Sequence, residues 1–154
     1  MHRTKAITAG AAALGMTLAV AAAQVGTASA AAHAHAHAAA EPKVYVTIQG
    51  RTKTLLKNES ITAPTGSVTR GGVRAGVCPG DSAQGVLNVA TLGNWKGKWY
   101  ASYKEYYITA ILGDTETSKK YYWGLFVNGK STSKGACDVI LKTGDKVLFK
   151  VVKG

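Results

Sequence analysis

The chain has 154 residues, of which 19 are Lys or Arg and 8 are Asp or Glu, so its formal net charge is +11. Hydrophobic residues make up 46% of the sequence, but alanine in the first forty positions supplies much of that share. This length leaves room for one domain of ordinary size. It excludes a multidomain enzyme and a polytopic membrane protein.

The first thirty residues have the pattern of a secretory signal peptide. A basic head over residues 1–5 precedes an uncharged run over residues 6–23 and a small-residue stretch that ends in Ala28-Ser29-Ala30. A membrane anchor is the alternative, because the uncharged run approaches the length that spans a bilayer. Alanine is only weakly hydrophobic, so we expect cleavage after Ala30 and a secreted protein, either extracellular or in the cell wall.

Cleavage after Ala30 changes the charge of what remains. It leaves 124 residues, and the loss of Arg3 and Lys5 lowers the basic residues from 19 to 17 against 8 acidic ones, a net charge of +9. No later segment is long and apolar enough to span a bilayer. We therefore expect no membrane span in the mature chain.

Residues 31–42 consist mostly of alanine and histidine. They contain too few large apolar side chains to offset the entropy of folding, so we expect a disordered leader before a single domain over residues 43–154. Neutral imidazoles in such a tract can bind a transition metal, here through His33, His35 and His37. A plain spacer is the alternative, because nothing in the tract orients the rings.

A period-two pattern over residues 44–49 predicts a strand, and a turn at Gly50-Arg51 joins it to a second strand over residues 52–56. The apolar residues on one face of the first strand are Val44, Val46 and Ile48. The chain is therefore predicted to begin its fold with a β-hairpin. Residues 58–76 are rich in Thr, Ser, Gly, Pro and Arg without a clear period, so we expect mostly surface loop there, with short extended pieces.

One helix is predicted after the turn at Pro79-Gly80, with Asp81 or Ser82 capping its first N–H groups. Its apolar stripe consists of Ala83, Val86, Leu87 and Ala90. Gly93-Asn94 is typical of a helix end. Gly85 inside the stripe costs about 1 kcal/mol relative to alanine, so we expect the helix backbone to approach the sheet closely there.

The remaining residues favour β-structure. Strands are predicted over residues 98–103, 106–112, 121–127 and 147–152, separated by polar turns over residues 113–120 and 142–146. Asn128-Gly129 is the strongest hairpin signal, because both central residues of a type I′ turn need positive φ. Strands on both sides of one helix indicate an α+β fold, with an antiparallel or mixed sheet and one central helix. An all-β sandwich is the alternative.

Cys78 and Cys137 are the only cysteines. An exported chain meets oxidising surroundings, so we expect a disulfide that closes a loop of about sixty residues and contributes about 2–4 kcal/mol. It would join the start of the predicted helix to the stretch before the last strand. Two cysteines without a nearby histidine cannot provide the four ligands of a structural zinc site.

The expected domain contains no histidine, which excludes Ser-His-Asp and Cys-His catalysis. Four of its carboxylates lie in turn or cap positions, namely Asp81, Asp114, Asp138 and Asp145. A pair formed by Glu105 and Asp114 is the one conceivable hydrolytic arrangement. We expect a protein that is not an enzyme.

A net charge of +9 with interleaved aromatic residues is also typical of proteins that bind single-stranded nucleic acid. Here the lysines are spread singly along every segment, and secretion argues against a nucleic-acid partner. Anionic polymers of the cell envelope are the better match for a charged partner. A high net charge also keeps a protein soluble and monomeric, and we expect a monomer.

The second half of the chain contains Trp95, Trp99, Trp123 and most of the seven tyrosines. Aromatic pairs within a sheet account for some of this density, and we expect that role for Trp123. Trp95 lies in a turn-like stretch beside Lys96, where we expect exposure. It is therefore a candidate for ligand contact.

Several runs follow one another in a fixed order: Cys78-Pro79-Gly80-Asp81-Ser82-Ala83, Asn94-Trp95-Lys96-Gly97, residues 121–130, Gly135-Ala136-Cys137 and Thr143-Gly144-Asp145-Lys146-Val147. Together they resemble the transcobalamin-like C-terminal domain family, a set of secreted bacterial modules, over residues 44–152. The resemblance implies a β-grasp-like fold of the type that binds soluble ligands. The best-known members bind cobalamin with the help of a separate helical barrel, and we expect no such barrel in these residues.

The resemblance also implies that the hairpin at Asn128-Gly129 faces a ligand. Tyr122, Trp123 and Asn128 are then the positions to test, beside Trp95, and core or turn roles are the alternative for each. The family provides no catalytic residues to carry over, and no cofactor is expected beyond the implied cobalamin. We predict a secreted, non-catalytic module for a soluble small ligand. The alternative is a structural or adhesive cell-wall protein that acts through its basic and aromatic surface.

Overall fold

The computed structural model describes residues 40–69, 76–115 and 119–154. The expected signal peptide over residues 1–30 and the tract with His33, His35 and His37 lie outside these ranges. Of the expected leader, only residues 40–42 are described, and they have no regular secondary structure. Within the described ranges, no helix is long and apolar enough to cross a bilayer.

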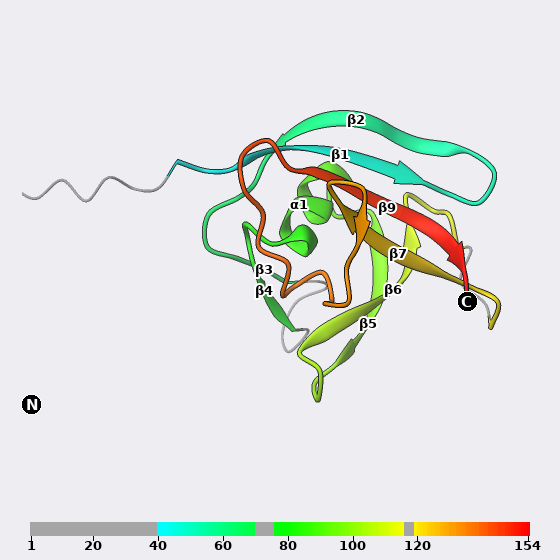
Figure 1. Cartoon of the computed structure of the whole chain (residues 1–154). Helices are drawn as coiled ribbons and strands as arrows, with labels where there is room; N and C mark the ends of the chain where they lie inside the picture. The colour runs from blue at the N-terminus through cyan, green and yellow to red at the C-terminus, as the bar shows by residue number, and fades with distance from the viewer. Residues whose placement is uncertain (1–39, 70–75, 116–118) are drawn as a thin grey trace, which may run out of the picture. The chain divides into compact units, whose positions relative to one another are not determined.

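A five-stranded mixed sheet forms the centre of the fold, in the order β2-β1-β9-β7-β8 (Figure 1). β1 (Lys43–Gln49) pairs antiparallel with β2 (Thr54–Thr62) and parallel with β9 (Lys146–Lys153). β7 (Tyr121–Val127) pairs antiparallel with β9 and turns into the short β8 (Lys130–Ser131). Two strands from opposite ends of the domain are thus neighbours in the middle of the sheet.

The predicted hairpin of β1 and β2 is confirmed, and the three apolar residues predicted to share a face of β1 are fully buried. β2 continues to Thr62, however, so the loop expected from residue 58 onward is wrong in its first part. Pairing with β1, which reaches from Gln49↔Thr54 to Lys43↔Thr62, holds these polar residues in an extended conformation. Cross-strand hydrogen bonds therefore override their loop-like composition.

Two short strands precede the helix, and the first is one of the short extended pieces expected within residues 58–76. β3 (Ser67–Thr69) and β4 (Val77–Pro79) pair antiparallel in a sheet of their own. Each has three residues, which is too short to show a period in the sequence.

The predicted helix is confirmed as α1 (Ala83–Ala90), which lies against one face of the central sheet (Figure 1). Ser82 is its N-cap, because the Oγ atom accepts a hydrogen bond from the Gly85 N–H at 3.2 Å and donates one to the Pro79 carbonyl at 2.6 Å. The left-handed conformation of Gly93, with φ of +75°, follows the helix as predicted.

Gly85 makes a close backbone approach, but the expectation that it approaches the sheet is wrong. A Cβ atom at this position would overlap the main chain of Gly80. The first turn of α1 therefore packs onto the turn that precedes it, and only glycine leaves room for that contact.

β5 (Trp95–Tyr100) and β6 (Glu105–Ile111) form a separate antiparallel hairpin. Trp95 was expected in an exposed turn, and this is wrong, because its side chain is only 2% exposed. Its Nε1 donates to Oδ1 of Asn88 on α1 at 3.0 Å, and its ring packs edge-on against Tyr106. Burial of the ring, with its polar atom satisfied, outweighs the turn-like sequence around it.

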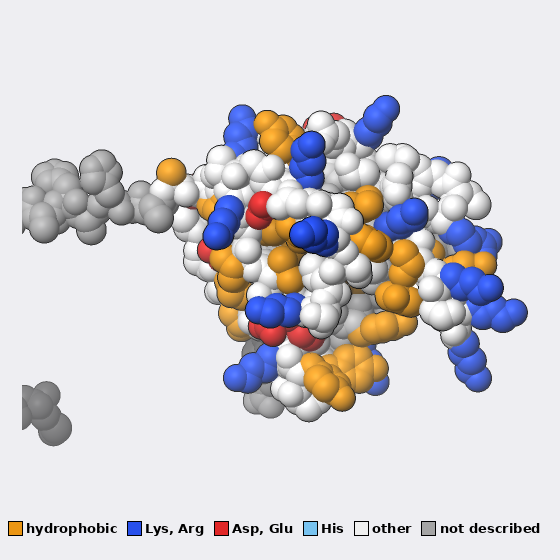
Figure 2. Space-filling model, viewed as in Figure 1, with side chains coloured by type: hydrophobic (Ala, Val, Ile, Leu, Met, Phe, Trp, Pro, Cys, Tyr) orange, Lys and Arg blue, Asp and Glu red, His pale blue; other side chains and the backbone are white. Residues whose placement is uncertain are grey.

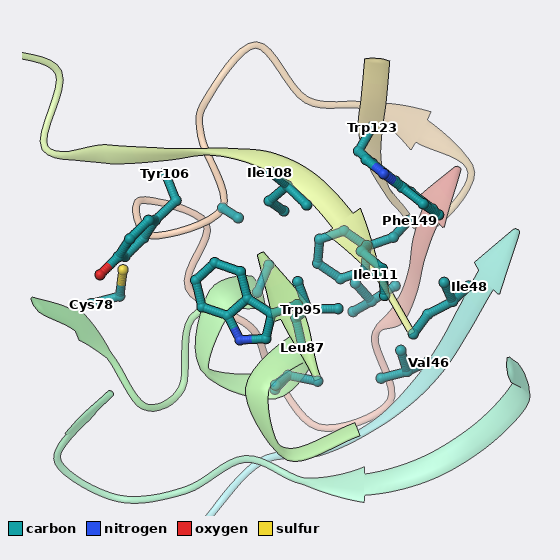
Figure 3. Close-up of a cluster of buried hydrophobic side chains, with 14 of the residues drawn as sticks. Val46, Ile48, Cys78, Leu87, Trp95, Tyr106, Ile108, Ile111, Trp123 and Phe149 are labelled. Atoms are coloured by element: carbon teal, nitrogen blue, oxygen red, sulfur yellow. The ribbon is translucent and has the colours of Figure 1, made fainter. Parts of the chain in front are cut away.

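The core lies between the central sheet, α1 and the β5–β6 hairpin (Figure 3). Figure 3 shows the Trp95 ring between Tyr106 and Leu87, with Phe149 of β9 further along the same cluster. Trp123 of β7 is also buried, as expected from its place in an alternating strand.

The turn at Asn128-Gly129 has positive φ at both residues, +52° and +79°, which confirms the predicted hairpin. The chain as described is β-rich, with mixed and antiparallel sheets and one short helix. The coarser part of the predicted fold class, a sheet with one helix on its face, is therefore confirmed.

Cys78 and Cys137 form the predicted disulfide, with their Cα atoms 4.9 Å apart and a sequence separation of 59. Cys78 lies in β4, just before α1, and Cys137 lies in the loop that leads to β9. The bond therefore joins the two segments that the sequence indicated. Loop closure of this kind contributes about 2–4 kcal/mol.

Glu105 fixes the same loop from the other side. Its carboxylate oxygens accept hydrogen bonds from the main-chain N–H groups of Cys137 at 3.1 Å and Asp138 at 3.0 Å. Burial raises the pKa of Glu105 above its ordinary value, and the nearby Asp138 charge adds to this, while the backbone hydrogen bonds act in the opposite direction.

We expect Gly85→Ala to destabilise the fold by about 1–3 kcal/mol, because the added methyl group meets the Gly80 backbone. The same change in an unobstructed helix would stabilise it by about 1 kcal/mol. Urea denaturation of the two proteins measures the difference. A variant that unfolds at a higher urea concentration than the parent would contradict the prediction. It would show that the turn before α1 can move to make room for the methyl group.

Gln84 is fully buried, and neither its Nε2 nor its Oε1 has a hydrogen-bond partner within the described structure. Methionine has a similar shape and carries no amide to desolvate. We therefore expect Gln84→Met to raise the free energy of unfolding by about 1–3 kcal/mol. A loss of stability in the same denaturation experiment would contradict this reading.

Glu105 also predicts a pH dependence. A carboxyl whose pKa is higher in the folded state binds its proton more tightly there, so its contribution to stability is present at low pH and falls as the group ionises. Relative to Glu105→Gln, the parent should lose stability between about pH 4 and pH 7. Denaturation at both pH values tests this, with Glu59→Gln on exposed β2 as the control. The prediction would be refuted if the free energies of unfolding of the parent and of Glu105→Gln differed by the same amount at both pH values.

Candidate functional site

β6 and β7 belong to different sheets, and a slot of about 210 Å³ lies between them. Its walls are residues 106–108 of β6, residues 122–126 of β7 and residues from the loop 131–136, with Phe149 and Val152 of β9. Both strands present backbone and aromatic side chains to the same opening.

A second hollow, of about 420 Å³, adjoins the slot at the β5–β6 hairpin. It is lined by Tyr100, Tyr103, Glu105, Tyr106, Tyr107 and Gly135. Three of these residues, Tyr106, Tyr107 and Gly135, also line the slot, so the two form one continuous surface. We call this surface the aromatic groove. Figure 2 shows hydrophobic side chains gathered at the tip of the β5–β6 hairpin and above it toward β7.

Tyr106 forms a fixed wall of the aromatic groove. Its hydroxyl donates to the Gly76 carbonyl at 2.8 Å, and its ring lies edge-on to Trp95 and Trp99. The side chain is buried on the core side. The groove therefore rests on packed structure rather than on a loop.

Four other tyrosines are exposed around the groove, namely Tyr100, Tyr103, Tyr107 and Tyr122. Tyr103, in the turn between β5 and β6, is 72% exposed. Exposed rings that cluster around a hollow indicate an interaction site more often than scattered ones do. Tyrosine combines a flat apolar face with a hydroxyl that can hydrogen-bond at the rim.

The polar groups of the groove are few. Trp123 lines the slot, and its buried Nε1 has no hydrogen-bond partner in the part of the chain that the structure describes. Among the described residues that line the groove, Lys134 is the one cation. The Glu105 carboxylate is already engaged by two backbone N–H groups. A Cβ atom on Gly135 would overlap this carboxylate, so a larger residue there would push the Glu105 side chain away from its present position.

The structure brings two of the four ligand candidates from the sequence into the groove. Tyr122 and Trp123 both line the slot. Trp95 lies beneath it in the core and bonds to Asn88. Asn128 lies at the hairpin tip, where its Nδ2 donates to Asp145 at 2.8 Å and its Oδ1 accepts from a backbone N–H at 2.9 Å. Its side chain therefore links the turn between β7 and β8 to the turn that precedes β9.

Sequence reasoning missed three lining tyrosines, Tyr100, Tyr103 and Tyr107. The density of tyrosine between residues 100 and 107 was visible, but their convergence depends on the four-residue turn of the β5–β6 hairpin. Period-two alternation in β6 separates buried Tyr106 from exposed Tyr107 and was the available signal.

The structure does not bring Glu105 and Asp114 together as a carboxylate pair. Glu105 begins β6, and Asp114 bonds to Ile111 at the other end of that strand. Seven extended residues place them about 20 Å apart, which is beyond the separations that glycosidases use. No group of three or more metal-binding side chains occurs within the described residues.

A different region carries basic side chains. A hollow of about 310 Å³ at the β1–β2 turn is lined by residues 49–54 and Lys150. Arg51 in this turn lies over the Tyr121 ring, with 5.0 Å between the guanidinium carbon and the ring centroid. Elsewhere, Lys and Arg side chains are spread over the visible face (Figure 2).

Residues 80–153 match the family model of a domain of unknown function, DUF4430. No curated protein matches the chain. Among solved structures, haptocorrin in complex with Cbi is similar, with a TM-score of 0.53 and 18% identity over 74% of this chain. The match spans 25% of the haptocorrin chain, so this chain corresponds to about a quarter of that protein.

A protein from Ruminococcus gnavus, provisionally described as metal binding, is also similar, with a TM-score of 0.51 and 16% identity. That match covers 74% of this chain and 99% of the other. At these identities the two likenesses show a shared fold. The β-rich domain described above is thus found both as a part of a larger protein and as nearly a whole chain.

Proposed function

We propose that this chain is a secreted, non-catalytic binding module that holds a soluble ligand in the aromatic groove. The observation that carries the proposal is the set of exposed tyrosines around a continuous hollow whose wall, Tyr106, is fixed by the core. Binding sites are typically concave and largely apolar, with a few placed polar groups. The groove has these properties, with the Lys134 ammonium and the Trp123 Nε1, which has no partner among the described residues, as its polar groups.

The proposed fold type is β-grasp-like. The order β2-β1-β9-β7-β8, with β1 and β9 parallel at the centre and α1 on one face, supports it. The likeness to part of haptocorrin supports the same assignment. A cobalamin-like ligand is the first candidate, because the haptocorrin structure holds Cbi and the sequence resembles the transcobalamin-like family.

The proposal that the chain is not an enzyme is supported by the engaged state of its carboxylates. Glu105 holds a loop, and Asp145 accepts hydrogen bonds from Asn128 and the Lys142 N–H. These side chains have structural partners that a general acid or base would need to leave.

Attachment to an anionic polymer of the cell envelope is the second candidate. The basic hollow at Arg51, Lys53 and Lys150 favours it, together with the net charge of +9 after cleavage. Such binding is electrostatic and weakens as salt screens the charges. Binding in the aromatic groove should depend much less on ionic strength.

Titration of the protein with cobinamide, followed by corrinoid absorbance, tests the proposed function. We expect a saturable spectral change that Tyr103→Ala weakens about two- to tenfold, the range for loss of one aromatic contact. Tyr103 is mostly exposed, so the variant should fold normally. Tyr45→Ala, on the exposed face of β1, is the matched control and should bind like the parent. No spectral change at saturating protein would exclude a corrinoid ligand.

A further inference from the structure

Part of β7 has an uncovered edge that faces the slot. β9 pairs with β7 along its full length on one side, but β8 covers the other side only at Phe126 and Val127. β6, across the slot, belongs to another sheet. Within residues 40–69, 76–115 and 119–154, no strand therefore pairs with residues 121–124 of β7 on the slot side.

The main chain of Trp123 points to this uncovered edge. The Leu125 carbonyl accepts a hydrogen bond from the Thr132 N–H at 3.0 Å, which shows that its polar groups face the β8 side. Main-chain groups alternate between the two edges of a strand with a period of two. The N–H and carbonyl of Trp123 therefore face the same side as those of Leu125, beyond the reach of β8.

The side chain of Trp123 adds a second feature that points to a ligand. It is only 9% exposed, and its buried Nε1 has no hydrogen-bond partner among the residues that the structure describes. A buried donor without a partner is destabilising, and most such groups in proteins are satisfied. An occupant of the slot with a carbonyl group would provide the missing acceptor.

The opposite outer strand of the sheet is protected against pairing, whereas this edge is not. β2 breaks register with β1, contains Asn58 at φ of +50°, and exposes Lys57 and Glu59. Bulges and charges of this kind prevent a further strand from joining an edge. β7 keeps an unbroken register with β9 and has no charged residue within Tyr121–Val127.

We propose that the uncovered edge of β7 binds an extended, acidic segment of another polypeptide as an added strand. The inference rests on the proposed function in that the slot is part of the aromatic groove. Main-chain hydrogen bonds to Trp123 hold the segment, and one apolar side chain enters the slot. Acidic character follows from charge, because Lys134 lines the slot and none of the described residues that line it is acidic.

The experiment uses the full chain and a short acetylated peptide of alternating glutamate and valine as the probe. Nuclear magnetic resonance follows the Trp123 amide and indole N–H signals during titration. We expect both protons to shift downfield and to exchange more slowly with solvent, because each gains an acceptor. The same peptide with every amide N-methylated keeps its side chains and loses its backbone donors, and it should not produce these changes.

Three variants sharpen the test. Lys134→Glu should weaken peptide binding about three- to tenfold at low salt, whereas Lys57→Glu on β2 makes the same charge change away from the slot and should have no effect. Trp123→Phe keeps the ring character and removes Nε1–H, so binding should weaken about two- to tenfold. Thermal unfolding confirms that each variant is folded.

The outcomes separate this inference from the proposed function. Equal binding of the N-methylated peptide, or shifts that spare β7, would overturn strand addition. Cobinamide binding that is sensitive to Tyr103→Ala, without any response to the peptide, would support the small-ligand function and reject the inference. A peptide response at Trp123 without cobinamide binding would support strand addition and reject the proposed small-ligand function.

Discussion

Parallel pairing of β1 with β9 is the constraint on which the rest of the structure depends. Parallel neighbours cannot be joined by a tight turn, so the chain between them must cross over the sheet. Here the crossover contains α1, the β5–β6 hairpin and the β7–β8 hairpin. The helix fills the face of the sheet, and the β5–β6 hairpin closes the core with Trp95 beneath Tyr106. The aromatic groove exists because that hairpin ends beside β7 without joining its sheet.

The groove combines a fixed base with an exposed rim. Tyr106 is held by a hydrogen bond and by two tryptophan rings, and the loop opposite is held by the disulfide and by Glu105. Tyr103 and Tyr107 project from this base into solvent. Such an arrangement lowers the ordering cost of binding, because few groups remain to be immobilised when a ligand arrives.

The sequence predicted those elements that depend on residues close together in the chain. Alternation predicted β1, the pair Asp81 and Ser82 predicted the start of α1, which Ser82 caps, and Asn128-Gly129 predicted a hairpin. The burial of Trp95 was not predictable, because its partner Asn88 comes from the helix and the surrounding glycines and lysines resemble a turn. The groove was predictable only in part, through Tyr122 and Trp123, since its other wall comes from a strand in a different sheet.

Substitutions at Gly135 and substitutions of the exposed tyrosines should affect the aromatic groove differently. A larger residue at position 135 would overlap the Glu105 carboxylate, so either that side chain leaves its two backbone hydrogen bonds or the wall shared by the slot and the hollow shifts. The exposed tyrosines carry no such restriction, because their side chains end in solvent. Related chains can therefore exchange the rim residues and acquire new ligands on an unchanged scaffold, provided that the glycine and the glutamate are inherited together.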